Sequence, residues 1–168
     1  MKPLSASSSR YGSVAIALHW IVAALMVVNV ALGLYGTVVP DAWARAVIDT
    51  HKSIGVTVLG LAILRLLWRL AHPAPPLPAA YPRWERIAAH VVHGLLYLLI
   101  LVLPITGWMH DSAWKDAASH PMSLFGLLPW PRIGWIMQVE PASKERLHDL
   151  FYGWHATLAY ALYVLLGL

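Results

Sequence analysis

Histidines have the clearest potential for chemistry in this sequence, because several of them fall inside long apolar segments. His19, His51 and His155 each lie in such a segment, and His90 and His93 lie together in another. An ionisable group at membrane depth is energetically expensive and therefore indicates a functional site. Neutral imidazole is a common metal ligand and also binds haem iron. The histidines therefore predict a metal or haem site inside a membrane.

Other metal and catalytic chemistries fit the residues less well. The sequence has no cysteine, which excludes disulfides, thiolate metal sites and covalent haem attachment through C-x-x-C-H. Zinc or iron without haem prefers three or four converging ligands, often carboxylates, and the apolar segments contain no Asp or Glu in their interiors. A G-x-S-x-G motif, as in nucleophilic hydrolases, is also absent from the sequence. Haem is the group that these observations favour.

The elements that must position the histidines are membrane-spanning helices. Of the 168 residues, 59% are hydrophobic and 12% are charged, against about 25% charged in an average soluble domain. A spanning helix needs about 20 mostly apolar residues, and four segments qualify: 13–37, 51–71, 88–110 and 150–168. We therefore expect an all-α integral membrane four-helix bundle with up-down-up-down topology, forming one domain over residues 1–168. No internal repeat is evident at the residue level.

Two connections and the basic residues predict how the bundle lies in the membrane. Residues 111–149 are expected to form a long loop on the outer membrane surface that covers the helix ends, and the Pro-rich 72–82 to form a short extended connection. Basic residues gather at the N-terminus and around the second connection: Lys2, Arg10, Arg65, Arg69, Arg83 and Arg86. The positive-inside rule then places the N-terminus in the cytoplasm, and four spans return the C-terminus to that side. Basic runs interleaved with aromatics are missing, so lipid rather than nucleic acid is the expected partner.

In this topology the histidines fall at two depths. His51 and His155 share the outer level, whereas His19 shares the inner level with His90 and His93. Inward-facing histidines at two levels of a helix bundle are the arrangement that mounts two haems across a membrane. Interfacial placement is the competing interpretation for the histidines nearer the helix ends, His72, His110, His120 and His148. For His90 and His93 a purely structural role stays open.

A spacing of fourteen residues links the two levels. Fourteen residues of helix rise about 21 Å and return to the same face. Gly33 follows His19 at this spacing, Arg65 follows His51, and Gly107 follows His93. We interpret the glycines as room for a bulky planar group, although small residues also serve tight helix packing. Arg65 is interpreted as a partner for a haem propionate at the inner level.

Short motifs in a fixed order carry a resemblance to a known family. They are "ALHWIVA" in the first span, "THKSIGV" and "LRLLWRL" in the second, "AHVVHGLLYLLILVLPITGW" in the third and "GWHATLAY" in the fourth. From residue 11 to the end, the sequence resembles the bacterial cytochrome b561 family. These are small four-helix di-haem proteins of the inner membrane that include superoxide:ubiquinone oxidoreductases. The resemblance therefore implies haem b as the cofactor.

The resemblance implies His19, His51 and His155 as haem ligands. His51 and His155 would hold the outer haem, and His19 would hold the inner haem together with a histidine fourteen residues beyond His155. That position directly follows Leu168. We expect the sequence to be a fragment that stops one residue short of this ligand. The alternatives are that His93 or His90 substitutes, or that the inner haem is lost.

The resemblance also implies electron transfer between ubiquinone in the bilayer and a donor or acceptor at the outer face. Superoxide is one candidate donor, and a redox partner protein is another. Lys52, beside His51, either draws an anion toward the outer haem or simply extends to the membrane interface. Two other functions stay open: a membrane-anchor cytochrome b subunit of a hydrogenase or dehydrogenase, and a haem-free membrane scaffold.

Overall fold

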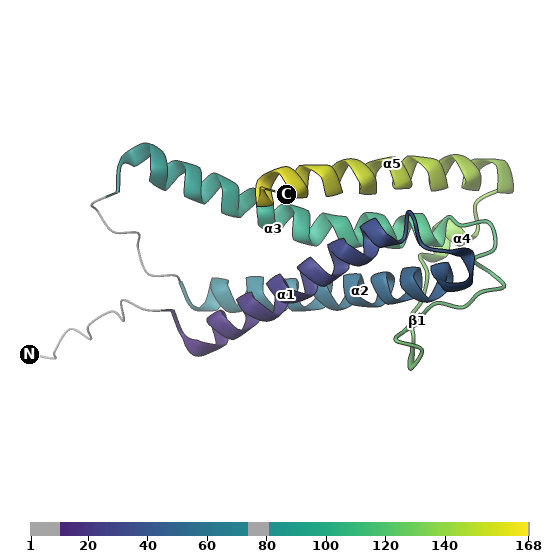
Figure 1. Cartoon of the computed structure of the whole chain (residues 1–168), viewed down its shortest axis with the longest axis horizontal. Helices are drawn as coiled ribbons and strands as arrows, with labels where there is room; N and C mark the ends of the chain where they lie inside the picture. The colour runs from purple at the N-terminus through teal and green to yellow at the C-terminus, as the bar shows by residue number, and fades with distance from the viewer. Residues whose placement is uncertain (1–10, 74–80, 168) are drawn as a thin grey trace, which may run out of the picture.

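The structure, a computed structural model, describes residues 11–73 and 81–167. Its elements in chain order are α1 (Ser13–Tyr35), α2 (Asp41–Ala71), α3 (Arg83–Ser112), β1 (Ser123–Leu124), β2 (Leu128–Pro129), α4 (Gly134–Met137) and α5 (Pro141–Leu166). Figure 1 shows α1, α2, α3 and α5 running along the length of the molecule, with the short elements gathered at one end. Lys2, Arg10 and most of the Pro-rich connection lie outside the described residues, so the predictions made for them stay predictions.

Three of the described helices are long and apolar enough to cross a membrane, namely α1, α2 and α3. They expose large apolar side chains such as Val27, Leu67 and Val91. In water such apolar surfaces would cause the protein to associate or aggregate, whereas lipid solvates them. The multi-pass membrane architecture predicted from composition is therefore confirmed for these three helices. α5 is also long, with 26 residues, but its first turns are polar, and its crossing of the membrane stays a prediction.

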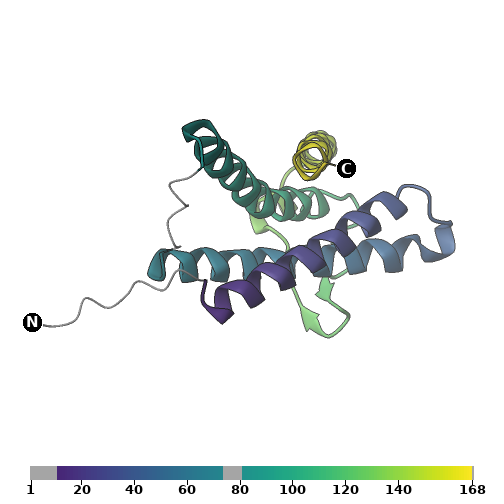
Figure 2. The ribbon, with the colours of Figure 1, turned by 60° about the vertical axis from the view of Figure 1, so that its left-hand side comes forward.

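The long helices pack as two pairs, α1 with α2 and α3 with α5, and α2 contacts α3 to join them. Figure 2 shows the two pairs from a second direction. Buried aliphatic side chains fill the two pair interfaces: Val22, Ile54 and Val58 between α1 and α2, and Leu99, Leu103 and Leu162 between α3 and α5. Each pair thus has a core of its own, and the functional side chains lie where the pairs face each other.

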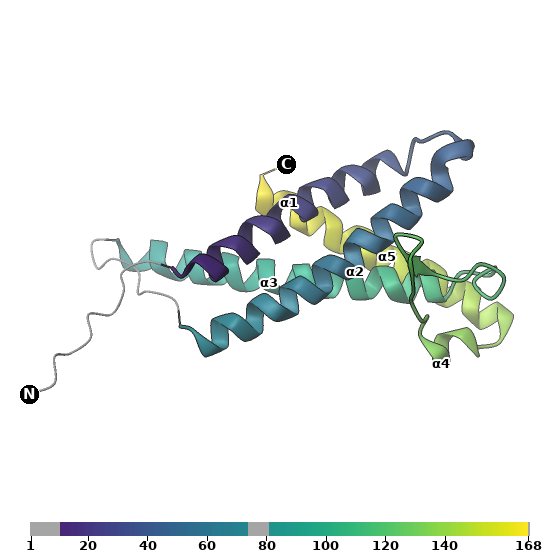
Figure 3. The ribbon, with the colours of Figure 1, turned by 90° about the horizontal axis from the view of Figure 1, so that it is seen from below.

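The connection from α3 to α5 packs over the ends of α2 and α3. Its β1–β2 hairpin is held by Ser53 of α2, whose hydroxyl accepts a hydrogen bond from the Phe125 backbone N–H at 2.9 Å. On the other side, Ser112 accepts from the Ile133 backbone N–H at 3.0 Å, and Ile136 of α4 is fully buried against Phe151. Figure 3 shows α4 beside the ends of α3 and α5. The connection therefore packs over these helix ends.

Two predicted boundaries are wrong. α2 begins at Asp41 rather than near His51, so His51 lies within the helix instead of opening it. α5 begins at Pro141 rather than near Leu150, which shortens the predicted 111–149 loop. The early start has a local cause, because Glu140 caps the helix by accepting from the Ala142 N–H at 3.2 Å and proline suits the first helical turn. Apolar composition identifies the part of a helix that lipid covers and misses its polar extension.

Candidate haem-binding sites

His51 of α2 and His155 of α5 face each other across the two helix pairs. Their ring centroids are 6.1 Å apart and their planes are nearly perpendicular, at 88°. Both side chains are partly buried. These are the two residues that the depth argument placed at a common level, and the structure brings them together from positions 104 residues apart in the sequence.

Each ring is oriented by the neighbouring helix of its own pair. The Nδ1 atom of His51 lies 3.0 Å from the carbonyl oxygen of Asn29 in α1. The Nδ1 atom of His155 lies 3.0 Å from the carbonyl oxygen of Leu103 in α3. A carbonyl oxygen can only accept, so Nδ1 carries the proton and donates in both rings. The lone pair of each neutral ring is then on Nε2, which leaves that atom available as a ligand.

A glycine one turn beyond each carbonyl makes room for each ring. A Cβ atom added to Gly33 would lie 3.2 Å from His51 Cε1, and one added to Gly107 would lie 3.1 Å from His155 Cε1. The glycines were expected to leave room for a planar group at the histidine level, and the planar groups they admit are the imidazoles themselves. The fourteen-residue spacing from His19 and His93 identified Gly33 and Gly107 as positions that admit a planar group. The rings that these glycines contact are those of His51 and His155, on the neighbouring helices.

The residues at this level fit a haem. Two imidazoles that bind one metal ion from opposite sides, with metal–nitrogen bonds of about 2 Å, have ring centroids roughly 6 Å apart, close to the observed separation. Within residues 11–73 and 81–167 there is no group of three or more His, Asp or Glu side chains that could hold a metal ion. A metal held by protein side chains alone therefore has no candidate site there, whereas two histidines would suffice to hold a haem.

The inner level forms a basic and aromatic cavity of about 220 Å³. Its lining includes His19 of α1, Arg65 and Arg69 of α2, and His93 and Tyr97 of α3. The guanidinium carbons of Arg65 and Arg69 lie 5.2 and 5.7 Å from the centroid of the Tyr97 ring. In the described chain neither arginine forms a salt bridge with a carboxylate. The cavity, which His72 also lines, therefore offers three imidazoles and two cations to an anionic group.

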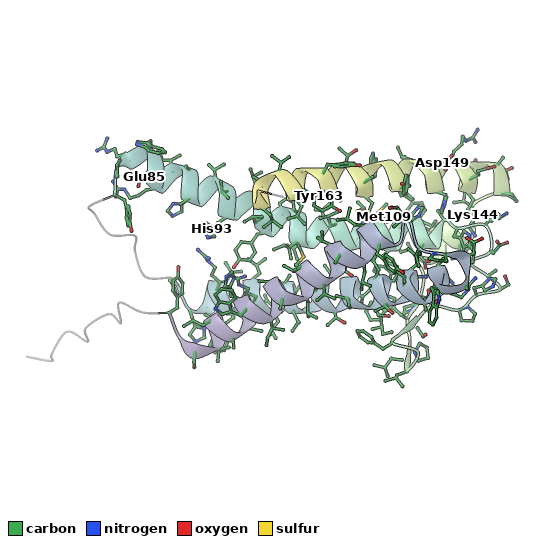
Figure 4. All side chains as sticks on the ribbon, in the orientation of Figure 1. Glu85, His93, Met109, Lys144, Asp149 and Tyr163 are labelled. Carbon is green, nitrogen blue, oxygen red and sulfur yellow. The ribbon has the colours of Figure 1, made fainter. Side chains whose placement is uncertain are left out.

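His93 is placed toward this cavity from α3. Figure 4 shows it on the side of α3 that faces α1 and α2, and its Nδ1 lies 2.7 Å from the carbonyl oxygen of Ala89. His90 makes the equivalent contact with Arg86 at 2.6 Å but is not part of the cavity lining. The described part of α5 contributes no residue to the lining either. Of the two third-span histidines, the structure thus groups His93 with His19.

Sequence comparison shows the family of the chain. The profile of prokaryotic cytochrome b561 matches residues 10–168. The chain belongs to this family. It is 35% identical over 125 residues to cytochrome b561 homolog 2 of Escherichia coli (strain K12), a match covering 73% of this chain and 64% of that protein. It is 28% identical over 167 residues to the probable superoxide oxidase CybB of Yersinia pestis, covering 95% of this chain and 84% of that protein. The chain thus spans less than two thirds of the length of the first relative.

Membership of the cytochrome b561 family shows which class of protein this chain belongs to. It belongs to a family of membrane cytochromes, and that family uses b-type haem. It is a multi-pass protein of the bacterial inner membrane, in contact with lipid through the exposed apolar side chains of its helices. The two-level histidine pattern is therefore found in a family that carries the expected cofactor.

Lys52 does not have the role expected for it in this cytochrome b561 chain. Its Nζ lies 2.6 Å from Asp49 and 3.0 Å from Asp111, and Arg132 binds the second Asp111 oxygen at 2.9 Å. Two carboxylates neutralise the ammonium, so it neither attracts an anion as a free cation nor extends alone to the interface. The cluster instead joins α2, α3 and the connection that covers them.

Sequence reasoning missed several contacts of the two levels. Thr106 places its hydroxyl 3.1 Å from His155 Nδ1, and Asn29 contributes its backbone carbonyl to His51. Arg69 and Tyr97 share the inner cavity. Arg69 was detectable, since it lies four residues after Arg65 and so on the same helix face. The Thr106 and Asn29 contacts depend on how two helices are rotated against each other, which one sequence does not reveal.

The remaining histidines lie at helix ends or on exposed turns. His110 and His148 stack at 3.9 Å between ring centroids, and each Nδ1 lies within 3.2 Å of the other residue's carbonyl oxygen. His72 stacks on Trp68 at 4.1 Å and also lines the inner cavity. His120 hydrogen-bonds within its own turn. The contacts between His110 and His148 join α3 to α5; the interfacial position predicted for these histidines stays a prediction.

Proposed function

We propose that this chain holds haem b between His51 and His155 and passes electrons between the ubiquinone pool and a donor or acceptor on the outer side of the membrane. One observation carries the proposal. The two rings face each other at 6.1 Å while the Nδ1 atom of each lies against a backbone carbonyl. In both rings Nε2 is then the nitrogen that remains available as a ligand.

Haem b supplies one-electron redox chemistry when it is bound. His51 and His155 would together hold the haem, and two histidine ligands would favour electron transfer over oxygen binding. The carbonyls of Asn29 and Leu103 keep the rings oriented and raise their basicity.

We propose His19 as a ligand of a second, inner haem. His93 and His72 share its cavity, and we take His93 as the partner of His19 because the ring of His72 stacks on Trp68. Arg65, with Arg69 beside it, provides the positive charge that two haem propionates require. The absence of a carboxylate partner for either arginine in the described chain supports this role.

We propose superoxide as the outer electron donor. One relative is named a probable superoxide oxidase. Two superoxide anions lose one electron each and leave as O₂, and ubiquinone takes up the two electrons with two protons to become ubiquinol. A redox partner protein is the alternative donor, and a soluble dehydrogenase or hydrogenase that co-purifies in stoichiometric amounts would favour it.

We propose a single transmembrane domain over residues 1–168 with α5 as the fourth span and both termini in the cytoplasm. His51 and His155 then lie toward the outer face and His19 toward the inner face. The sequence has no cysteine, so a single cysteine introduced at Lys144 or at Arg86 reports its side of the membrane. An impermeant thiol reagent added to intact spheroplasts should label the first position and spare the second.

Haem content of the purified protein tests the proposal directly. A reduced-minus-oxidised spectrum should show a sharp b-type α-band, and His51→Ala and His155→Ala should each remove the haem of the outer site. His90→Ala is the matched control, because its exposed ring lies in α3 outside the cavity, and it should keep the full haem content. A wild-type protein without an α-band would instead leave a haem-free scaffold as the explanation. Superoxide-dependent reduction of ubiquinone by the isolated protein then tests the donor.

A further inference from the structure

Thr106 is a buried hydroxyl at the outer level to which no role has been assigned. Its side chain is 4% exposed, and it lies in α3 next to Gly107. The hydroxyl donates to the carbonyl oxygen of Leu103 at 2.8 Å. Its oxygen also lies 3.1 Å from His155 Nδ1, and the Leu103 carbonyl lies 3.0 Å from the same nitrogen. The three groups form a closed triangle of polar contacts.

The triangle distinguishes His155 from His51. On α1, Asn29 and Gly33 are four residues apart and hold His51; on α3, Leu103 and Gly107 are four residues apart and hold His155. The residue before the glycine is Leu32 on α1 and Thr106 on α3. In the described contacts, the Nδ1 of His51 therefore has the carbonyl oxygen of Asn29 as its partner, whereas the Nδ1 of His155 has a carbonyl and a hydroxyl.

The direction of the hydrogen bonds follows from which atoms can donate. The Thr106 proton is directed to the Leu103 carbonyl, so the hydroxyl oxygen presents a lone pair to the Nδ1–H of His155. The Nδ1–H is then shared between two acceptors. Both acceptors draw the proton away from the ring and increase the electron density on Nε2, and burial strengthens the effect.

We propose that Thr106 is a positioning residue that makes His155 the more electron-donating of the two outer ligands. The inference rests on the proposed function, since it requires a haem between His51 and His155. A more electron-donating ligand stabilises ferric over ferrous iron. Thr106 therefore lowers the midpoint potential of the outer haem and fixes the tautomer and orientation of the His155 ring.

Three variants separate the hydroxyl from its methyl group and from the helix. Thr106→Val has nearly the same shape and lacks the hydroxyl, and Thr106→Ser restores it. Thr57→Val is the matched control, because Thr57 in α2 donates to the Ser53 carbonyl at 2.8 Å and is not bonded to a histidine. Each full-length protein is purified in detergent, and its haem-to-protein ratio, its midpoint potential from an optical redox titration and its ferric EPR spectrum are measured.

Thr106→Val should raise the midpoint potential of the outer haem by about 30 mV, which corresponds to roughly a threefold change in the ratio of ferric to ferrous affinity at 59 mV per tenfold. Its ferric EPR signal should also shift. Thr106→Ser and Thr57→Val should match the wild type in both measurements. Loss of haem in Thr106→Val with retention in Thr106→Ser also supports the proposal, because only the hydroxyl differs in hydrogen-bonding ability.

Two results would overturn it. An unchanged potential and EPR signal in Thr106→Val would show that the hydroxyl does not influence the ligand. Equal changes in Thr106→Val and Thr106→Ser would assign the effect to packing. Failure of the proposed function gives a different result, because wild-type protein, or protein carrying His155→Ala, would then have the wrong haem content before any potential is compared.

Discussion

The glycine that contacts His155 provides the sharpest test of the outer site. Replacement of Gly107 by alanine places a methyl carbon 3.1 Å from Cε1 and 3.3 Å from Nδ1 of His155. The ring has little freedom to move away, because its Nδ1 is held by the Leu103 carbonyl at 3.0 Å and by the Thr106 hydroxyl at 3.1 Å. A shift large enough to relieve the contact therefore stretches these hydrogen bonds or rotates Nε2 out of position.

The size of the effect follows from the cost of overpacking. An extra methyl group in a well-packed site costs about 1–3 kcal/mol. At roughly 1.4 kcal/mol per tenfold change in an equilibrium constant, Gly107→Ala should weaken haem binding at the outer site by about 5-fold to 150-fold. The gain of roughly 1 kcal/mol in helix propensity on replacing glycine by alanine stabilises the helix and not the ligand position, so it does not restore haem binding.

Titration of haem into apoprotein, followed by the α-band of the reduced form, measures this loss. Gly94→Ala is the matched control in the same helix, because a Cβ there has nothing within 4 Å. It should bind haem like the wild type. The reasoning fails if Gly107→Ala and Gly94→Ala bind haem equally well, since the ring of His155 would then be free to give way.

Two further predictions concern the ion cluster and the inner cavity. Asp111→Asn removes the carboxylate that Lys52 and Arg132 share in a largely buried position. Loss of one partner of a buried ion pair typically costs about 3–5 kcal/mol, so thermal unfolding in detergent should occur well below the wild-type temperature. Asp49→Asn, at a more exposed carboxylate, should change the unfolding temperature little. Arg65→Gln removes a cation from the inner cavity. This change should lower the midpoint potential of an inner haem, because ferrous iron loses a stabilising positive charge. A redox titration in which only the potential of the outer haem moved would contradict the placement of Arg65 at the inner haem.

The sequence predicted the depth of residues along the helices better than the rotation of each helix about its axis. Hydropathy and the positions of His51 and His155 were enough to predict that these two residues share one level, because depth along a helix follows directly from residue number. The role of Gly33 and Gly107 was predicted only in part. Which neighbour a glycine admits depends on the rotation of each helix about its axis, and no single-sequence pattern encodes that rotation.

The same limit explains the error at Lys52. The sequence shows a lysine beside a candidate ligand, but its partners Asp49 and Asp111 lie on two different helices. Asp49 fell outside the predicted second span because the polar first turns of α2 lower its apolar content. A span prediction that stops at the edge of the apolar segment therefore also omits the charges that neutralise its end.

The two helix pairs form the outer site through the same set of contacts. In each pair, one helix provides a carbonyl and, one turn later, a glycine, and the other helix provides the histidine that fits between them. The carbonyl, the glycine and the histidine that they contact all belong to one helix pair. Each ring is therefore oriented by contacts within its own pair. The tautomer and direction of each ligand are then fixed by contacts within its own helix pair. Because that ordering is part of folding, a haem entering between the pairs need not immobilise its ligands, and binding is stronger for it.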